Sequence, residues 1–98
     1  MDKSYVIEKL KDHEAELRAA GIMHLRVFGS VARDEFSVDS DVDLLADFDK
    51  AQRLTLVKVG SLQVRLSKML GANVDLSSPE WMREPVRAKA IGEAILAF

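Results

Sequence analysis

The sequence predicts a small α/β (α+β) domain whose sheet has helices on one face and an open face for a site. Apolar residues recur at helical spacing near the start of the chain and again after residue 54. Three short segments instead alternate apolar and polar residues, the period of two that is typical of half-buried strands. Because the chain has only 98 residues, we expect one domain over residues 1–98.

The first helix and strand follow from capping signals and periodicity. Asp2 or Ser4 can cap a helix that runs to about Ala20, and the glycine after it is a natural helix end. A strand is expected over Met23–Phe28. Its alternation places on one side Met23, Leu25 and Val27.

The later elements are placed by the same signals, with prolines and glycines as boundaries. We expect a helical turn over Ser30–Asp34, a strand over Asp41–Phe48, a helix over Leu54–Leu70 and a strand over Asn73–Ser77. A further helix should start at Ser78–Pro79, and Pro85 should either interrupt it or start the next one. A final helix is expected over Arg87–Phe98.

Composition and charge exclude several classes of protein. The formal net charge is −2, so the chain has no broad basic surface for gripping nucleic acid, and we expect no direct nucleic-acid binding. It contains no cysteine, which excludes disulfides and thiolate metal sites. We see no signal peptide and no apolar run that approaches a membrane span. The expectation is a cytoplasmic protein without membrane contact, and self-association into a homo-oligomer stays open.

A short turn after the first strand has the residue types that bind phosphate. Gly29 lets the backbone approach a ligand closely, because it has no Cβ. Ser30 adds a hydroxyl donor. Arg33, one turn further on, could donate to phosphate oxygens, although a solvated arginine is an equal alternative. We therefore interpret Gly29, Ser30 and Arg33 as candidate nucleotide-binding residues.

Three carboxylates are candidates for metal binding. Asp41 and Asp43 share one face of their predicted strand, and two like charges that close repel each other unless a cation lies between them. Asp75, on the later strand, points away from the core side of Val74 and Leu76, and if both strands lie in one sheet it shares the face of Asp41 and Asp43. Carboxylate oxygens suit Mg²⁺, which also binds substrate phosphates, and two such ions can act together in an in-line displacement. Surface positions are the alternative for all three.

This combination resembles the nucleotidyltransferase superfamily that includes DNA polymerase β. The shared pattern is a Gly-Ser turn, ten residues, Asp-x-Asp and a third Asp on a later strand. In its small size and in the sequences of Gly29–Arg33 and Ser40–Leu45, the chain is similar to the minimal nucleotidyltransferase (MNT) proteins. One departure is Asp34, where many relatives have glycine.

The resemblance implies a mixed sheet of the nucleotidyltransferase type and Mg²⁺-dependent transfer of AMP from ATP. It implies catalytic and metal-binding roles for Asp41, Asp43 and Asp75, and triphosphate binding at Gly29 and Ser30. It also implies an antitoxin whose partner is a HEPN-domain ribonuclease toxin, with a tyrosine hydroxyl as acceptor. Two alternatives remain: an antitoxin that neutralises its partner by occlusion with little or no catalysis, and nucleotidyl transfer to a small molecule.

Several other residues are of types that often act in functional sites, but a structural role is the simpler interpretation for them. His13 and His24 are read as ordinary helix and strand residues rather than acid–base groups. Trp81 and Phe98 are read as core or interface residues rather than a platform for adenine. Candidates for an apolar surface that a partner covers are Met82, Val86, Ile91 and Leu96.

Overall fold

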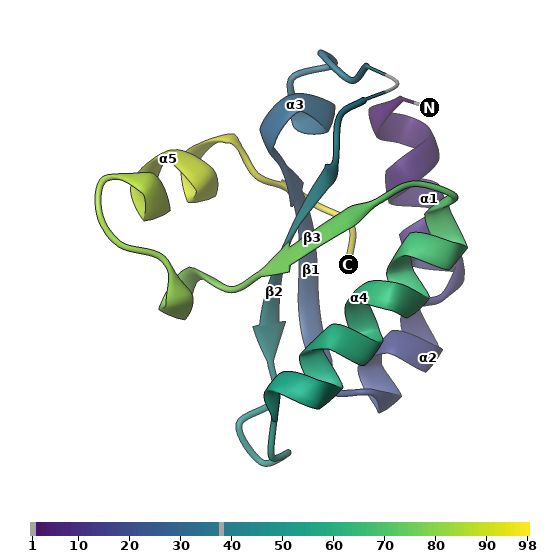
Figure 1. The fold of residues 1–98 in the computed structure, drawn as a ribbon, viewed down its shortest axis with the longest axis vertical. Coiled ribbons are helices and arrows are strands. Elements are labelled where there is room, and N and C mark those ends of the chain that lie inside the picture. Colours follow the sequence, from purple (N-terminus) through teal and green to yellow (C-terminus); the bar gives the residue numbers. More distant parts are fainter. Residues whose placement is uncertain (1, 38) are drawn as a thin grey trace.

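The computed structural model describes residues 2–37 and 39–98 and consists of one sheet with helices around it (Figure 1). In chain order the elements are α1 (Lys3–Asp12), α2 (Glu14–Ala19), β1 (Ile22–Phe28), α3 (Gly29–Ala32), β2 (Val42–Phe48), α4 (Leu56–Leu70), β3 (Val74–Ser77), a 3₁₀ turn η1 (Pro79–Trp81), α5 (Val86–Glu93) and β4 (Ile95–Leu96).

The sheet is mixed and has the order β3-β2-β1-β4. β1 is antiparallel to both β2 and β4, whereas β2 and β3 are parallel. Parallel neighbours need a crossover connection, and α4 provides it. This arrangement confirms the predicted fold class, a mixed sheet combined with helices.

The hydrophobic core lies between the sheet and α1, α2 and α4, which occupy one side of it (Figure 1). Leucines on each of these helices are fully or almost fully buried, and they pack against the alternate apolar residues of β1, β2 and β3. α5 lies on the other side of the sheet (Figure 1). α5 therefore covers part of the second face of the sheet, which the sequence predicted to be open.

β1 contains a bulge that corrects one sequence prediction. The register passes from Ile22 opposite Phe48 to His24 opposite Asp47, so β1 has one extra residue at this point. The alternation is broken there, and Ile22 and Leu25 are buried while Met23 is 47% exposed. Met23 was expected on the side of Leu25, and that expectation is wrong.

The first helical segment is divided rather than continuous. Asp2, one of the two predicted caps, accepts a hydrogen bond from the backbone N–H of Tyr5. The helix breaks at His13, which ends α1 and precedes α2. Nothing in the local composition explains this break. α4 begins two residues later than predicted, with Thr55 as its cap, and Gly71 ends it in a left-handed conformation as expected.

The C-terminus differs most from the prediction. Pro85 was expected either to start a helix or to interrupt one. A helix does begin after Pro85, but it ends at Glu93. Ile95 and Leu96 then form an edge strand beside β1. The free edge of β1 presents unpaired backbone groups that β4 satisfies, so the predicted helix to Phe98 is wrong. Ser78 precedes η1 without the side-chain cap that was expected.

Within residues 2–37 and 39–98, no helix is both long enough and apolar enough to cross a membrane.

Candidate functional site

The Gly29 turn and the carboxylates of β2 meet at the end of β1. Phe28, the last residue of β1, is the register partner of Asp43, so the turn after Phe28 starts directly beside Asp43. A Cβ on Gly29 would collide with the Asp43 carboxylate, whose Cγ would lie 3.1 Å away. Gly29 also has φ of 72°, which favours glycine. The position therefore requires glycine for two independent reasons.

α3 holds the remainder of the turn in place. Val31 and Ala32 are buried in the core, so this single helical turn is anchored on the sheet. Ser30 is half-buried in the same turn, and its carbonyl accepts a 2.7 Å hydrogen bond from the N–H of Glu35. The structure thus places Gly29 beside Asp43, and Ser30 follows it in the same turn.

The three predicted carboxylates lie at one edge of the site. Asp43 and Asp75 are register partners across the parallel β2–β3 pair, and Asp41 lies just before β2. Asp43 is half-buried, whereas Asp41 and Asp75 are exposed. The prediction that Asp75 shares a face with Asp43 is therefore confirmed by the register of the strands.

Asp43 shows the electrostatic cost of this arrangement. Burial raises the pKa of its carboxyl, and the charges of Asp75 and Asp41 raise it further, while Arg33 opposes the shift. A cation at this point would relieve the repulsion. Among the described residues, no group of three acidic or histidine side chains converges closely enough to enclose a metal. The donor set nevertheless fits a hard divalent cation, because it consists of carboxylates only.

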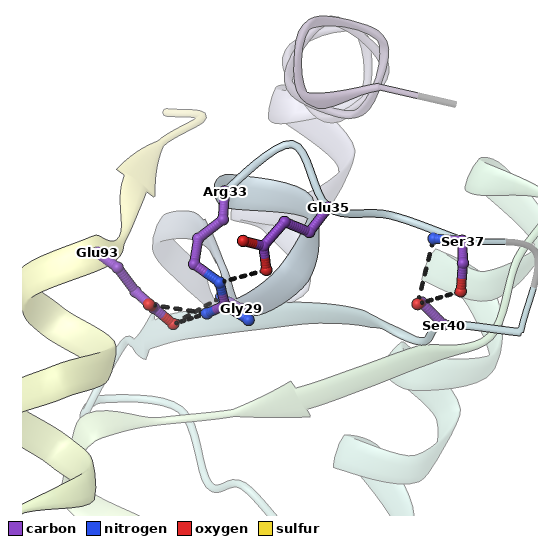
Figure 2. A network of polar contacts seen from close by, with 6 residues as sticks. All are labelled: Gly29, Arg33, Glu35, Ser37, Ser40 and Glu93. Carbon is purple, nitrogen blue, oxygen red and sulfur yellow. Dashed lines mark hydrogen bonds and ion pairs between the residues drawn. The ribbon is translucent and has the colours of Figure 1, made fainter.

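Arg33 is paired with two acidic side chains, and these contacts were not predicted from the sequence. Its Nη1 contacts both carboxylate oxygens of Glu93, at 3.0 and 2.9 Å, and its Nε donates to Glu35 at 3.0 Å. Figure 2 shows the guanidinium between these two acidic side chains. Hydrogen bonds from Arg33 to Glu35 and Glu93 raise the pKa of Arg33. Arg33 is therefore held by two carboxylates although its side chain is 41% exposed, and phosphate binding by Arg33 stays a prediction.

Glu93 is the residue at the site that the sequence did not reveal. Besides Arg33, its Oε1 accepts a 3.0 Å hydrogen bond from the backbone N–H of Gly29. Burial acts to raise the pKa of Glu93, but the hydrogen bonds from Arg33 and Gly29 and the positive charges of Arg33 and Lys89 outweigh it, and the pKa is lowered. Glu93 is 64 positions from Gly29, and no local signal in the sequence connects them.

The other residues singled out from the sequence have structural roles. Ser40 bonds to Ser37, with 2.9 Å between the two hydroxyl oxygens (Figure 2), just before the start of β2. Phe98 is buried in the core, and Trp81 stacks on Phe48 with 5.5 Å between ring centroids. His24 is exposed. His13 is half-exposed and lies 3.5 Å from Glu16.

Comparison with known proteins identifies the family. The model of the nucleotidyltransferase domain family matches residues 5–96. The chain belongs to the nucleotidyltransferase domain family. This nucleotidyltransferase is 34% identical over 87 residues to the protein adenylyltransferase MntA of Thermococcus cleftensis, a match that covers 88% of this chain and 86% of the relative.

Solved structures agree with this assignment. A structure assigned as a minimal nucleotidyltransferase superimposes with a TM-score of 0.81 at 34% identity and covers 97% of this nucleotidyltransferase and 95% of that chain. Two more distant matches share the fold. One is a toxin–antitoxin structure with AMP-PNP (TM-score 0.71, 17% identity, 100% of this chain and 73% of the other). The second contains a tri-AMPylated HEPN toxin of Shewanella oneidensis with an MNT antitoxin (TM-score 0.66, 16% identity, 94% and 71%).

Proposed function

We propose that this nucleotidyltransferase transfers AMP from Mg²⁺-ATP to a tyrosine hydroxyl of a partner protein, a HEPN ribonuclease, and thereby acts as an antitoxin. The observation that carries the proposal is the contact between Gly29 and Asp43, which brings the Gly-Ser turn against the carboxylates. The relative with 34% identity is named a protein adenylyltransferase, and a more distant structural neighbour joins an MNT antitoxin to an AMPylated HEPN toxin.

The residues of the site divide the work between phosphate and metal. Gly29 and Ser30 would bind the triphosphate. Asp41, Asp43 and Asp75 would hold Mg²⁺, and the proposed number of ions is two. Bound Mg²⁺ would neutralise charge on the phosphates and on the carboxylates, which supplies the electrostatic part of catalysis. AMP-PNP in a distant structural neighbour supports a nucleotide triphosphate as the substrate class.

The transfer itself needs little covalent chemistry from the protein. The acceptor oxygen attacks the α-phosphorus, a new oxygen–phosphorus bond forms, and the bond to the departing pyrophosphate breaks. The acceptor proton passes to a carboxylate, for which Asp75 is the candidate because it is exposed beside Asp43. The chain contributes mainly orientation of the two reactants.

The direct test uses ATP labelled on the α-phosphate, with Mg²⁺ and a purified HEPN ribonuclease from the same source. We expect label on the ribonuclease and loss of its activity. Asp41→Asn and Asp43→Asn should each reduce labelling by about 10²–10³-fold, the typical effect of removing a group that stabilises transition-state charge. Removal of Mg²⁺ with EDTA should abolish labelling.

Asp49→Asn is the matched control, because Asp49 lies after the opposite end of β2 and an asparagine keeps the acceptor for the N–H of Ala51. This variant should label normally. If the intact protein neutralises the ribonuclease without labelling it, and Asp43→Asn does so equally well, the proposal is wrong and the chain acts by occlusion.

A further inference from the structure

The carboxylate of Glu93 extends from α5 to the Gly29 turn, where it accepts hydrogen bonds from Gly29 and Arg33 (Figure 2). One oxygen receives both the Gly29 N–H and Arg33, and the second oxygen receives Arg33 alone. The side chain is only 21% exposed. Such charge-assisted bonds are stronger than neutral ones, so this contact fixes the position of the turn relative to α5.

We propose that Glu93 is a positioning residue for nucleotide binding: it holds the Gly29 N–H and the Arg33 guanidinium so that the turn stays against Asp43. The inference rests on the proposed function, because it concerns the same site. Glu93 does not touch the reacting atoms in this proposal. It acts through Gly29 and Arg33.

The surroundings of the turn explain why it needs such a brace. α3 is only four residues long, and a helix this short has little stability of its own. Its buried side is anchored by Val31 and Ala32. Its first residue is Gly29, and the first N–H groups of a helix have no acceptor within the helix itself. Glu93 supplies the acceptor for Gly29.

Arg33 is held from two sides, which limits where its charge can lie. Glu35 bonds to Nε and Glu93 bonds to Nη1. Arg33 is also the positive charge that acts on Asp43 against the repulsion of the other carboxylates. Loss of Glu93 would free the guanidinium to move and would leave the Gly29 N–H without its carboxylate. Both effects should weaken the nucleotide site.

The experiment measures the affinity of the full chain for Mg²⁺-AMP-PNP by titration calorimetry, at a temperature where circular dichroism shows every variant folded. Glu93→Ala should weaken binding about tenfold, the usual effect of losing a partner that orients a ligand-binding group. Glu93→Gln retains an oxygen for Gly29 and Arg33, and it should lose no more than about threefold. In the labelling reaction, Glu93→Ala should raise KM for ATP more than it lowers kcat.

Glu84→Gln is the control. Glu84 lies just before α5 and forms a similar 2.7 Å ion pair with Arg87, which lies within α5. It should leave affinity unchanged. If Glu93→Ala is folded and binds AMP-PNP as tightly as the intact chain, or more tightly, the inference is wrong; tighter binding would mean that Glu93 competes with phosphate. Failure of the intact chain to bind AMP-PNP would also overturn it. If the intact chain binds AMP-PNP but labels no protein, the proposed function fails, and weaker binding by Glu93→Ala still supports the inference.

Discussion

Gly29 is the residue at which backbone conformation and site chemistry depend on each other. Its φ of 72° and its contact with Asp43 leave no space for a side chain. Gly29→Ala should lower the free energy of unfolding by at least about 1 kcal/mol, because alanine is unfavourable in the left-handed region. It should also abolish labelling, because Asp43 must move to make room.

Gly60→Ala is the matched control for this prediction. Gly60 lies inside α4, and outside the adjoining backbone of this helix no atom of the described residues would lie within 4 Å of an added Cβ. Alanine is the better helix former there, so the free energy of unfolding should rise by about 1 kcal/mol. Urea denaturation of both variants checks the pair, and an equal effect of the two substitutions would contradict our account of Gly29.

Single residues of the site were predictable where their position follows from alternation along a strand. Asp43 and Asp75 were placed on a common face because Val42 and Val74 had to face the core. Arg33 was not predictable in this way. Its partner Glu93 lies 60 positions away on another helix, and pairing of surface charges leaves no periodic signal in a single sequence.

At the level of elements, β4 is the clearest case of tertiary contacts overriding local preference. The segment after Arg87 has residues that suit a helix, yet the backbone N–H of Ala97 donates to the carbonyl of Leu25 at 2.8 Å, and Leu25 donates to Phe98 at 3.1 Å. The bulge in β1 was missed for a related reason, since an extra residue in a strand depends on its neighbour strand. The well-separated periodic segments, α4 and β2 above all, were predicted to within two residues.

Phe98→Ala tests whether the C-terminal segment holds the edge of the sheet. Phe98 is 7% exposed in the core, and its ring lies 5.1 Å from the guanidinium carbon of Arg18. We expect a loss of about 3 kcal/mol in the free energy of unfolding. Hydrogen exchange should show reduced protection of the Leu25 and Ala97 amides.

Leu96→Ala supplies the comparison, because Leu96 lies in β4, two residues before Phe98, but is 52% exposed. It should change the free energy of unfolding by no more than about 0.5 kcal/mol. Equal losses in the two variants would mean that the buried ring is not what secures β4.

For the molecule as a whole, the site is a local source of instability. The pKa of Asp43 is raised above its usual value near 3.8, so between the unfolded and the folded pKa the folded chain binds more protons than the unfolded chain. The free energy of unfolding therefore falls as the pH rises through this interval, and this loss persists at neutral pH. Asp43→Asn should raise the melting temperature at pH 7, and this advantage should shrink as the pH is lowered from the raised pKa of Asp43 toward 3.8, below which both states bind the proton.

The control for this prediction is again Asp49→Asn, which should show no comparable pH-dependent gain. A melting temperature of Asp43→Asn equal to that of the intact chain at pH 7 would contradict the repulsion inferred at the site. Addition of Mg²⁺ should stabilise the intact chain more than Asp43→Asn, since a ligand stabilises a fold only to the extent that it binds the folded state.

The overall class of the fold was the most predictable property of this chain, because it depends on many residues at once. Alternating helical and strand periods set the number and type of most elements. The partial cover of the second face by α5 was not predictable, because only Ala90 is buried on α5 and its larger apolar side chains, Val86 and Ile91, are exposed. A helix with so small a buried face has no sequence pattern that predicts which element it packs against.

The parallel pairing of β2 and β3 has a consequence for how this family can diverge. Backbone hydrogen bonds set the register of Asp43 and Asp75, so the length and composition of the intervening crossover are under no constraint from the spacing of the two carboxylates. Insertions there cost little, because the entropy of a connection grows slowly with its length. A shift of β3 by a single position would instead turn Asp75 toward the helices. Natural variation should therefore gather in the connections around α4 and avoid the four residues of β3.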